Sequence, residues 1–168
     1  MPLFRLLPIL CSLMLASCAE TPELPPPVPP TQLTLQINAG KQLNPDAAGK
    51  ASPVLLRIYE LREQSGFAAA DFFTLFDKEQ LALGGDLLRK QELLIKPGEQ
   101  KTLPIEPAAD TRKLGFFAAF RKLDDAQWRA LAPLVLHQNN TVTLEIDRNV
   151  LGAKASAAEP APATPAEP

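Results

Sequence analysis

The chain has 168 residues, of which 46% are hydrophobic and 21% are charged, and its formal net charge is −2 at pH 7. This charge balance excludes a strongly basic nucleic-acid-binding protein, and the hydrophobic fraction excludes a chain that is disordered throughout. Eighteen prolines make up about 11% of the chain, roughly twice the ordinary usage. Most of them lie near the two ends, so they delimit a central body, residues 31–151, that is long enough to bury a core.

Residues 1–17 have the form of a signal peptide, with Arg5 before the ten-residue apolar run Leu6–Leu15. That run is shorter than the about 20 residues that cross a bilayer. Leu-Ala-Ser-Cys at positions 15–18 resembles a bacterial lipobox, which implies cleavage before Cys18 and an anchor in membrane lipid through the acylated Cys18. Ala19, where an aspartate often causes inner-membrane retention, favours the outer membrane. The alternative is an ordinary secretory signal with a chance cysteine.

A Pro-rich linker, residues 18–30, follows the signal, and an Ala/Pro-rich tail, residues 152–168, ends the chain. The linker favours extended polyproline II, at about 3.1 Å per residue, and is either a semi-rigid spacer or a featureless tether. The tail has no large apolar residue and is predicted to be disordered, with a partner-binding role left open. Because Cys11 lies in the signal and Cys18 is acylated, no thiol remains for catalysis, a metal site or a disulfide.

Apolar patterns predict four strands in the body. Residues 31–38 and 141–147 alternate apolar and polar side chains, which is typical of strands with one buried face. Residues 54–61 and 114–120 carry apolar residues on both faces. Such strands are covered on both sides, by a second sheet or by packed helices.

Two further segments, residues 91–95 and 100–105, flank the turn signal Pro97-Gly98. They are predicted to form a hairpin around that turn. Pro104 has no backbone N–H to donate, so it favours an edge strand.

Two short helices are predicted between the strands. Residues 71–79 have Asp71 as a plausible N-cap, and residues 124–128 have Asp124 and Gln127 at the spacing of a capping box. The whole pattern predicts a mainly β protein, a two-sheet β-sandwich of seven or eight strands with short helical insertions.

The body shows no spacing typical of a zinc site, a calcium loop or a nucleophile elbow, so we expect no enzyme activity, cofactor, metal or small-molecule substrate. His137 lies beside an apolar run and is interpreted as structural, with a hydrolase using it as a remote alternative. The carboxylates Asp71, Asp77 and Glu79 are explained by capping and by solvated helix faces. Four phenylalanines are interpreted as core residues, and a periplasmic ligand-binding lipoprotein with an apolar pocket is the alternative. They are Phe67, Phe72, Phe73 and Phe76.

The connection between the first two predicted strands, residues 39–52, has 14 residues, whereas hairpin connections usually have about two to five. Long ordered loops on a rigid scaffold commonly carry binding. Leu43 is predicted to be exposed there, in a turn formed by Asn44, Pro45 and Asp46. The loop is therefore the candidate binding site, and a tolerated surface insertion is the alternative.

A series of short motifs runs through the body in a fixed order. They are Leu43–Asp46, Ala51–Leu61, Phe67, Ala70–Phe73 with Leu75, Asp86–Leu88, Pro97–Glu99, Gly115–Arg121 and Trp128-Arg129. Each motif alone is weak, but the ordered set behind a lipobox resembles the outer-membrane lipoprotein of type VI secretion systems, the TssJ family.

The resemblance implies a transthyretin-like two-sheet sandwich and a structural role in the envelope-spanning membrane complex of a contractile secretion machine. It implies that the partner is the periplasmic C-terminal domain of the large IcmF-like inner-membrane protein, TssM. It also implies that the loop at residues 39–52 contributes to that contact. The expected contact residues are Gln42, Leu43, Asn44, Pro45 and Asp46.

Overall fold

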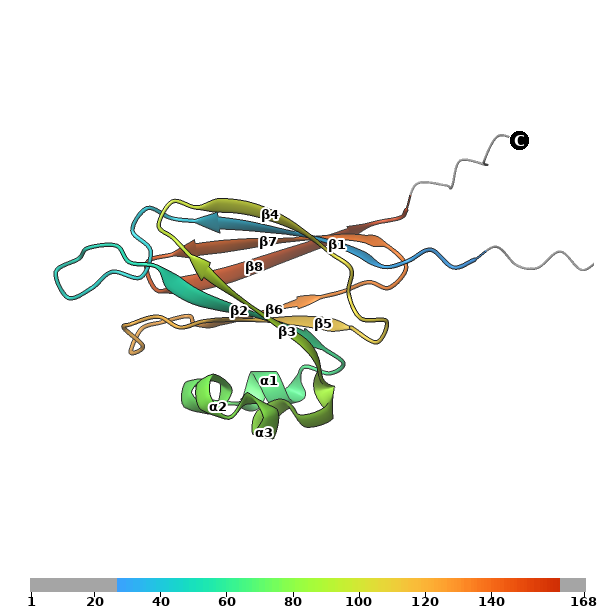
Figure 1. The fold of residues 1–168 in the computed structure, drawn as a ribbon, viewed down its shortest axis with the longest axis horizontal. Coiled ribbons are helices and arrows are strands. Elements are labelled where there is room, and N and C mark those ends of the chain that lie inside the picture. Colours follow the sequence, from blue (N-terminus) through green and yellow to red (C-terminus); the bar gives the residue numbers. More distant parts are fainter. Residues whose placement is uncertain (1–26, 161–168) are drawn as a thin grey trace, which may run out of the picture.

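The computed structural model describes residues 27–160, which form two four-stranded sheets packed face to face (Figure 1). Sheet A has the strand order β4-β1-β7-β8, and sheet B has the order β3-β2-β5-β6. The strands are β1 (Gln32–Ala39), β2 (Val54–Leu61), β3 (Leu87–Ile95), β4 (Gln100–Ile105), β5 (Lys113–Ala118), β6 (Arg129–Pro133), β7 (Asn139–Asp147) and β8 (Val150–Ala158). Between β2 and β3 lie α1 (Ser65–Ala69), α2 (Phe72–Asp77), α3 (Glu79–Leu83) and a 3-10 turn (Gly84–Asp86). The predicted two-sheet sandwich with short helical insertions is confirmed. The predicted signal peptide, Cys18 and most of the linker lie outside the described residues.

The two alternating strands form the centre of sheet A. β1 and β7 pair in parallel, with Leu35 opposite Val142, and both side chains are fully buried against sheet B. The polar residues between them, such as Gln36 and Thr143, lie on the outer face of the sheet. The alternation therefore predicted both the strands and the buried face correctly.

Sheet B is covered on both sides, as the continuous apolar pattern of β2 and β5 predicts. Leu56 and Phe116 are fully buried in the core between the sheets. Tyr59 and Phe117 are equally buried on the other side, in a second core beneath the helices. Figure 1 shows the helices as a third layer below sheet B. The three layers explain why β2 and β5 need apolar residues on both faces.

Asp71 caps α2 as predicted, because its side chain accepts hydrogen bonds from the backbone N–H and the hydroxyl of Thr74. These bonds lower the pKa of Asp71 below its ordinary value. The cap is therefore fully formed above the carboxyl's ordinary pKa and weakens as the pH falls through the lowered one. Phe72 and Phe76 stack with ring centroids 5.9 Å apart, which agrees with their i, i+4 spacing.

Arg57 of β2 holds α2 against sheet B. Its Nη1 donates to the carbonyl oxygens of Leu75 at 3.1 Å and Phe76 at 2.8 Å, which end the helix. Its Nε lies 2.8 Å from a carboxylate oxygen of Glu92. That approach lacks hydrogen-bond alignment, since Nε has no hydrogen-bond partner among the described residues, so we regard it as a charge pair. The guanidinium also lies over the ring of Phe76, 5.1 Å from its centroid.

Arg57→Met is expected to lower the free energy of unfolding by about 2 kcal/mol, because charged hydrogen bonds to partly buried carbonyls are lost while the side-chain volume is kept. Lys154→Met, on an exposed part of β8, is the matched control for replacing a cation by Met. Urea denaturation at pH 7 measures both variants. An equal loss of stability in the two would show that Arg57 has no special role in holding the helices.

β3 and β4 flank the Pro97-Gly98 turn but do not pair with each other, so the predicted hairpin is wrong. β3 pairs with β2 in sheet B, and β4 pairs with β1 in sheet A. Gly98 has φ = 76°, which lets the chain turn tightly where it passes from one sheet to the other. Pro104 does lie on an edge strand, as predicted.

The predicted helix at residues 124–128 is also wrong. After a turn at Asp124–Asp125, the N–H of Gln127 donates to Asn149, and its carbonyl oxygen accepts from Leu151. These bonds tie the segment to the start of β8, and a single helical turn is too short to compete with them.

The prediction that the tail is disordered is wrong for residues 152–158, because they belong to β8. Backbone pairing with β7 forms this edge strand without large side chains.

Candidate partner-binding site

Four connections gather at one end of the sandwich, which we call the loop end. They are the β1–β2 loop (residues 40–53), the β3–β4 turn (96–99), the β5–β6 connection (119–128) and the β7–β8 turn (148–149). Residues 27–31 enter, and β8 leaves, at the opposite end of the long axis (Figure 1). The β1–β2 loop therefore lies as far from the incoming linker as the fold allows.

Leu43 and Asn44 form the root of the β1–β2 loop and are both buried. Leu43 is fully buried in the core between the sheets, so the prediction that it is exposed is wrong. The chain turns back on itself there, since the N–H of Leu43 donates to Gly40 and its carbonyl oxygen accepts from Ser52. This turn directs the leucine inward, where its transfer from water is favourable.

Asn44 joins three of the four connections. Its side-chain oxygen accepts from the N–H of Arg121 at 2.8 Å, and its Nδ2 donates to the carbonyl oxygen of Pro53 at 2.7 Å. Its own N–H donates to Arg148 at 2.7 Å. Its φ of 45° lies in the left-handed region, which asparagine tolerates better than most residues. Asn44 thus acts as a positioning residue for the loop end.

The tip of the loop is a compact turn formed around Asp46. The Asp46 carboxylate accepts from the N–H groups of Ala48 and Lys50, both at 2.9 Å. The Asp46 N–H also donates to Lys50, and Gly49, at φ = 79°, closes the turn. Residues 47–50 are exposed, so the tip is ordered by its own hydrogen bonds yet open to a partner.

The structure places the five predicted contact residues in different environments. Gln42 is exposed, Pro45 and Asp46 are partly exposed, and Leu43 and Asn44 are buried. Only the first three can present side chains to a partner in this conformation. Their role in binding stays a prediction.

A trough of about 710 Å³ runs beside the loop root. It is lined by Asn44–Ala47, Arg121–Asp124 and Arg148–Asn149. Arg121 and Arg148 form no ion pair within the described part of the chain, whereas Lys122 pairs with Asp125. No spacing in the sequence predicts that the second and third segments lie beside the loop, because the trough forms only when two other connections fold back toward it.

The alternative site residues have structural partners. The Nδ1 of His137 lies 2.9 Å from the carbonyl oxygen of Pro29, and its backbone N–H donates to the hydroxyl of Thr31. It therefore holds the incoming linker. Phe67 is buried against Tyr59, with ring centroids 5.5 Å apart, and Phe72 packs on Phe117 at 4.8 Å. Phe73 and Phe76 are exposed rather than packed in the core.

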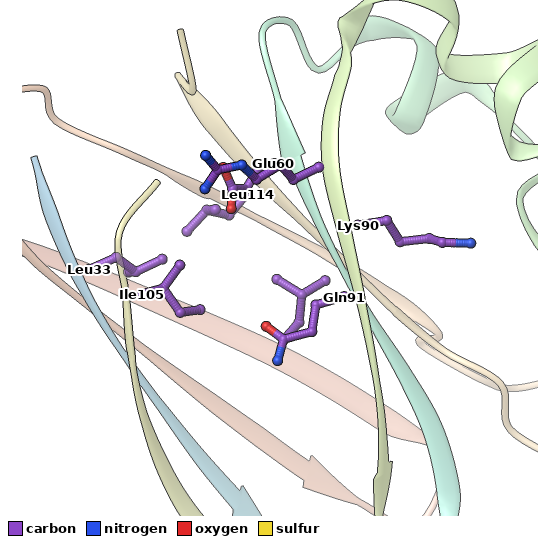
Figure 2. Close-up of a pocket in the computed structure, with 8 residues that line it drawn as sticks. Leu33, Glu60, Lys90, Gln91, Ile105 and Leu114 are labelled. Carbon is purple, nitrogen blue, oxygen red and sulfur yellow. The ribbon is translucent and has the colours of Figure 1, made fainter. Parts of the chain in front are cut away.

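Figure 2 shows a crevice of about 320 Å³ where the edge strands β3 and β4 diverge. Leu33, Ile105 and Leu114 form its apolar floor, and Lys90 is directed away from it. Glu60 on its wall accepts from the N–H of Ala108 and the hydroxyl of Thr111. The charged side chains Glu60, Arg89 and Lys90 already bond within the protein, so the crevice offers a ligand mainly apolar contact and the amide of Gln91.

Two other kinds of site are absent from residues 27–160. No three histidine, cysteine or acidic side chains in that range come together as metal ligands would. None of the helices there has the length and hydropathy needed to cross a membrane.

Comparison with known proteins gives consistent matches. The family described as "Type VI secretion lipoprotein, VasD, EvfM, TssJ, VC_A0113" matches residues 31–149. Among solved structures, the T6SS lipoprotein TssJ1 from Pseudomonas aeruginosa is 39% identical with a TM-score of 0.73, and the match covers 80% of this chain and 100% of that one. Serratia marcescens Lip, described as a membrane bound component of the Type VI Secretion System, is 25% identical with a TM-score of 0.66, covering 76% and 98%. A chain in a structure described as the T6SS protein TssM C-terminal domain (869-1107) from EAEC is 25% identical with a TM-score of 0.62, covering 74% and 98%. A search of curated proteins gives no match.

The fold defines a small two-sheet β-sandwich domain that presents four of its connections together at one end. The family match spans nearly the whole body, and the match to TssJ1 covers the full length of that chain. The chain belongs to the type VI secretion lipoprotein family that includes TssJ, which confirms the resemblance seen in the sequence.

Proposed function

We propose that this chain is an outer-membrane-anchored structural lipoprotein of the type VI secretion membrane complex and that its loop end binds the periplasmic C-terminal domain of TssM. The observation that carries the proposal is the arrangement of the sandwich along its long axis, with the linker at one end and the loop end at the other (Figure 1). A lipid anchor at Cys18 ties the first end to the membrane through the Pro-rich linker, whose composition predicts an extended reach of roughly 35 Å. The loop end then faces away from the membrane, toward a periplasmic partner.

The choice of partner is supported by the similarity to a chain in a structure described as the TssM C-terminal domain, at 25% identity. It is also supported by the architecture of the loop, which is rooted by Leu43 and Asn44 and closed at its tip by Asp46. An ordered loop loses little conformational freedom when it binds, so its contacts contribute more fully to affinity.

Replacing Asp46–Lys50 by two glycines is expected to weaken binding to the purified TssM domain at least tenfold. The change removes the exposed tip, but it leaves the buried root intact, and the ends of the removed turn are already joined by the Asp46 N–H bond to Lys50. The melting temperature should therefore stay close to that of the unmodified domain. Isothermal titration calorimetry measures the affinity, and thermal unfolding measures the stability.

Glu63→Ala with Gln64→Ala is the control, because both residues are exposed in the connection that follows β2 at the opposite end. This double variant should bind TssM as tightly as the unmodified protein. Unchanged affinity in the loop-tip variant would overturn the proposed role of the loop.

A further inference from the structure

Large apolar side chains are exposed on the helix-bearing side of sheet B. Phe73 is 64% exposed, Phe76 38% and Leu94 62%. Phe73 and Phe76 belong to α2, and Leu94 lies on the same outer face of sheet B, two residues beyond Glu92, which pairs with Arg57. We call these three residues the α2 patch. Clustered exposed apolar residues on a soluble domain commonly mark an interaction site.

The aromatic part of the patch is held rigidly from below. Phe72 packs edge-on against Phe73 at 5.4 Å and stacks on Phe76, while Arg57 lies over both Phe76 and Phe117. Because the rings are already fixed, a partner that covers them pays little in side-chain entropy. Aromatic and arginine side chains are also the types that contribute most to binding energy at interfaces.

The α2 patch borders the loop end on two sides. Trp128, at the end of the β5–β6 connection that lines the trough, packs edge-on against Phe72 at 5.4 Å. On the other side, Leu94 pairs with Leu55, which lies two residues after the last residue of the β1–β2 loop, Pro53. Figure 1 shows α2 at the same end of the molecule as these connections.

A stable interface requires more surface than the trough alone offers. Specific complexes bury about 800 Å² on each partner, which is about 20–30 residues a side, whereas ten residues line the trough. A partner seated in the trough must therefore extend over the surfaces beside it. The outer face of sheet A is polar there, with Asn38 hydrogen-bonded to Glu145 and Thr143 to Gln36. The α2 patch is the neighbouring surface that offers apolar contact.

We propose that the α2 patch is a second contact surface for the same TssM periplasmic domain and that it takes an apolar cluster of TssM side chains flanked by basic residues. The proposal rests on the proposed function. The basic flanks are inferred by charge complementarity from the exposed carboxylates Asp71 and Asp77 at the two ends of α2, with the exposed cation Lys78 next to Asp77.

Phe73→Ser tests the patch, since this ring is mostly exposed and its loss leaves the stack of Phe72 and Phe76 in place. We expect TssM binding to weaken at least tenfold with an unchanged melting temperature, and Phe73→Leu to keep most of the affinity. Asp77→Lys should slow association, and the effect should shrink at high salt. Val135→Ser is the matched control, because Val135 is 42% exposed and follows β6, which ends far from the loop end.

The loop-tip variant is measured in parallel so that the two proposals can fail separately. Weaker binding in Phe73→Ser, with or without an effect of the loop tip, supports the α2 patch. Wild-type affinity in Phe73→Ser with weaker binding in the loop-tip variant overturns the patch alone. Wild-type affinity in both variants overturns the patch and the proposed partner-binding function together.

Discussion

Cys18→Ser is expected to move the protein completely from the membrane fraction to the soluble periplasmic fraction and to abolish type VI secretion. A serine hydroxyl cannot form the thioether that carries the lipid, and stable anchoring requires two or more acyl chains. The variant should therefore lose attachment outright rather than in part.

Cys11→Ser is a closely matched control, since it makes the same substitution seven residues upstream, within the predicted signal peptide. This variant should be lipidated, fractionate with membranes and support secretion. Mass spectrometry of the mature N-terminus shows whether lipid is attached, and fractionation shows where the protein resides. Membrane-bound Cys18→Ser, or normal secretion by a soluble variant, would contradict the anchoring proposal.

The geometry of the fold explains why secretion should fail although the domain itself stays intact. The sandwich begins at β1, well after Cys18, so its stability does not depend on the lipid. A released domain would keep its loop end and with it the proposed contact to TssM. It would, however, no longer connect that partner to the membrane, and a structural anchor acts only through that connection.

The fold was predictable from the sequence wherever each strand shows its own pattern. The alternation in β1 and β7 identified their buried faces, and the apolar runs in β2 and β5 identified a layer covered on both sides. Asp71 marked the start of α2 because the cap is a local interaction. These features depend on side chains close in sequence, which is where pattern analysis is most informative.

The errors arose where distant segments decide the local structure. The hairpin prediction was wrong because β3 and β4 pair with strands of different sheets, which no local turn signal reveals. The helix at residues 124–128 failed because Gln127 bonds to the start of β8. Leu43 was expected at the surface for the same reason, since its burial depends on a loop that folds back onto the core. The trough likewise needs three connections to meet.

Asn44→Ala is expected to destabilise the domain by about 3 kcal/mol and to weaken TssM binding at least tenfold. The Arg121 N–H and the Pro53 carbonyl lose their side-chain partners in a partly buried site, and each lost bond costs about 1 kcal/mol. Alanine also tolerates the left-handed backbone at φ = 45° less well than asparagine, which adds about 1 kcal/mol. Because Asn44 joins three connections, the loss should disorder the whole loop end.

Two further substitutions at the same position separate these causes. Asn44→Gly keeps the backbone conformation but loses both side-chain bonds, so it should be more stable than Asn44→Ala. Asn44→Asp keeps the acceptor for Arg121 and tolerates the left-handed region, but it places a carboxylate oxygen against the Pro53 carbonyl oxygen in a buried site, so it should be less stable than Asn44→Gly. Chemical denaturation ranks the variants, and calorimetry with TssM tests whether affinity follows the same order. If the loop end is the binding site and Asn44 holds it in shape, the affinity for TssM must fall together with stability across the series. Full affinity in a destabilised Asn44→Ala variant would show that the partner binds elsewhere.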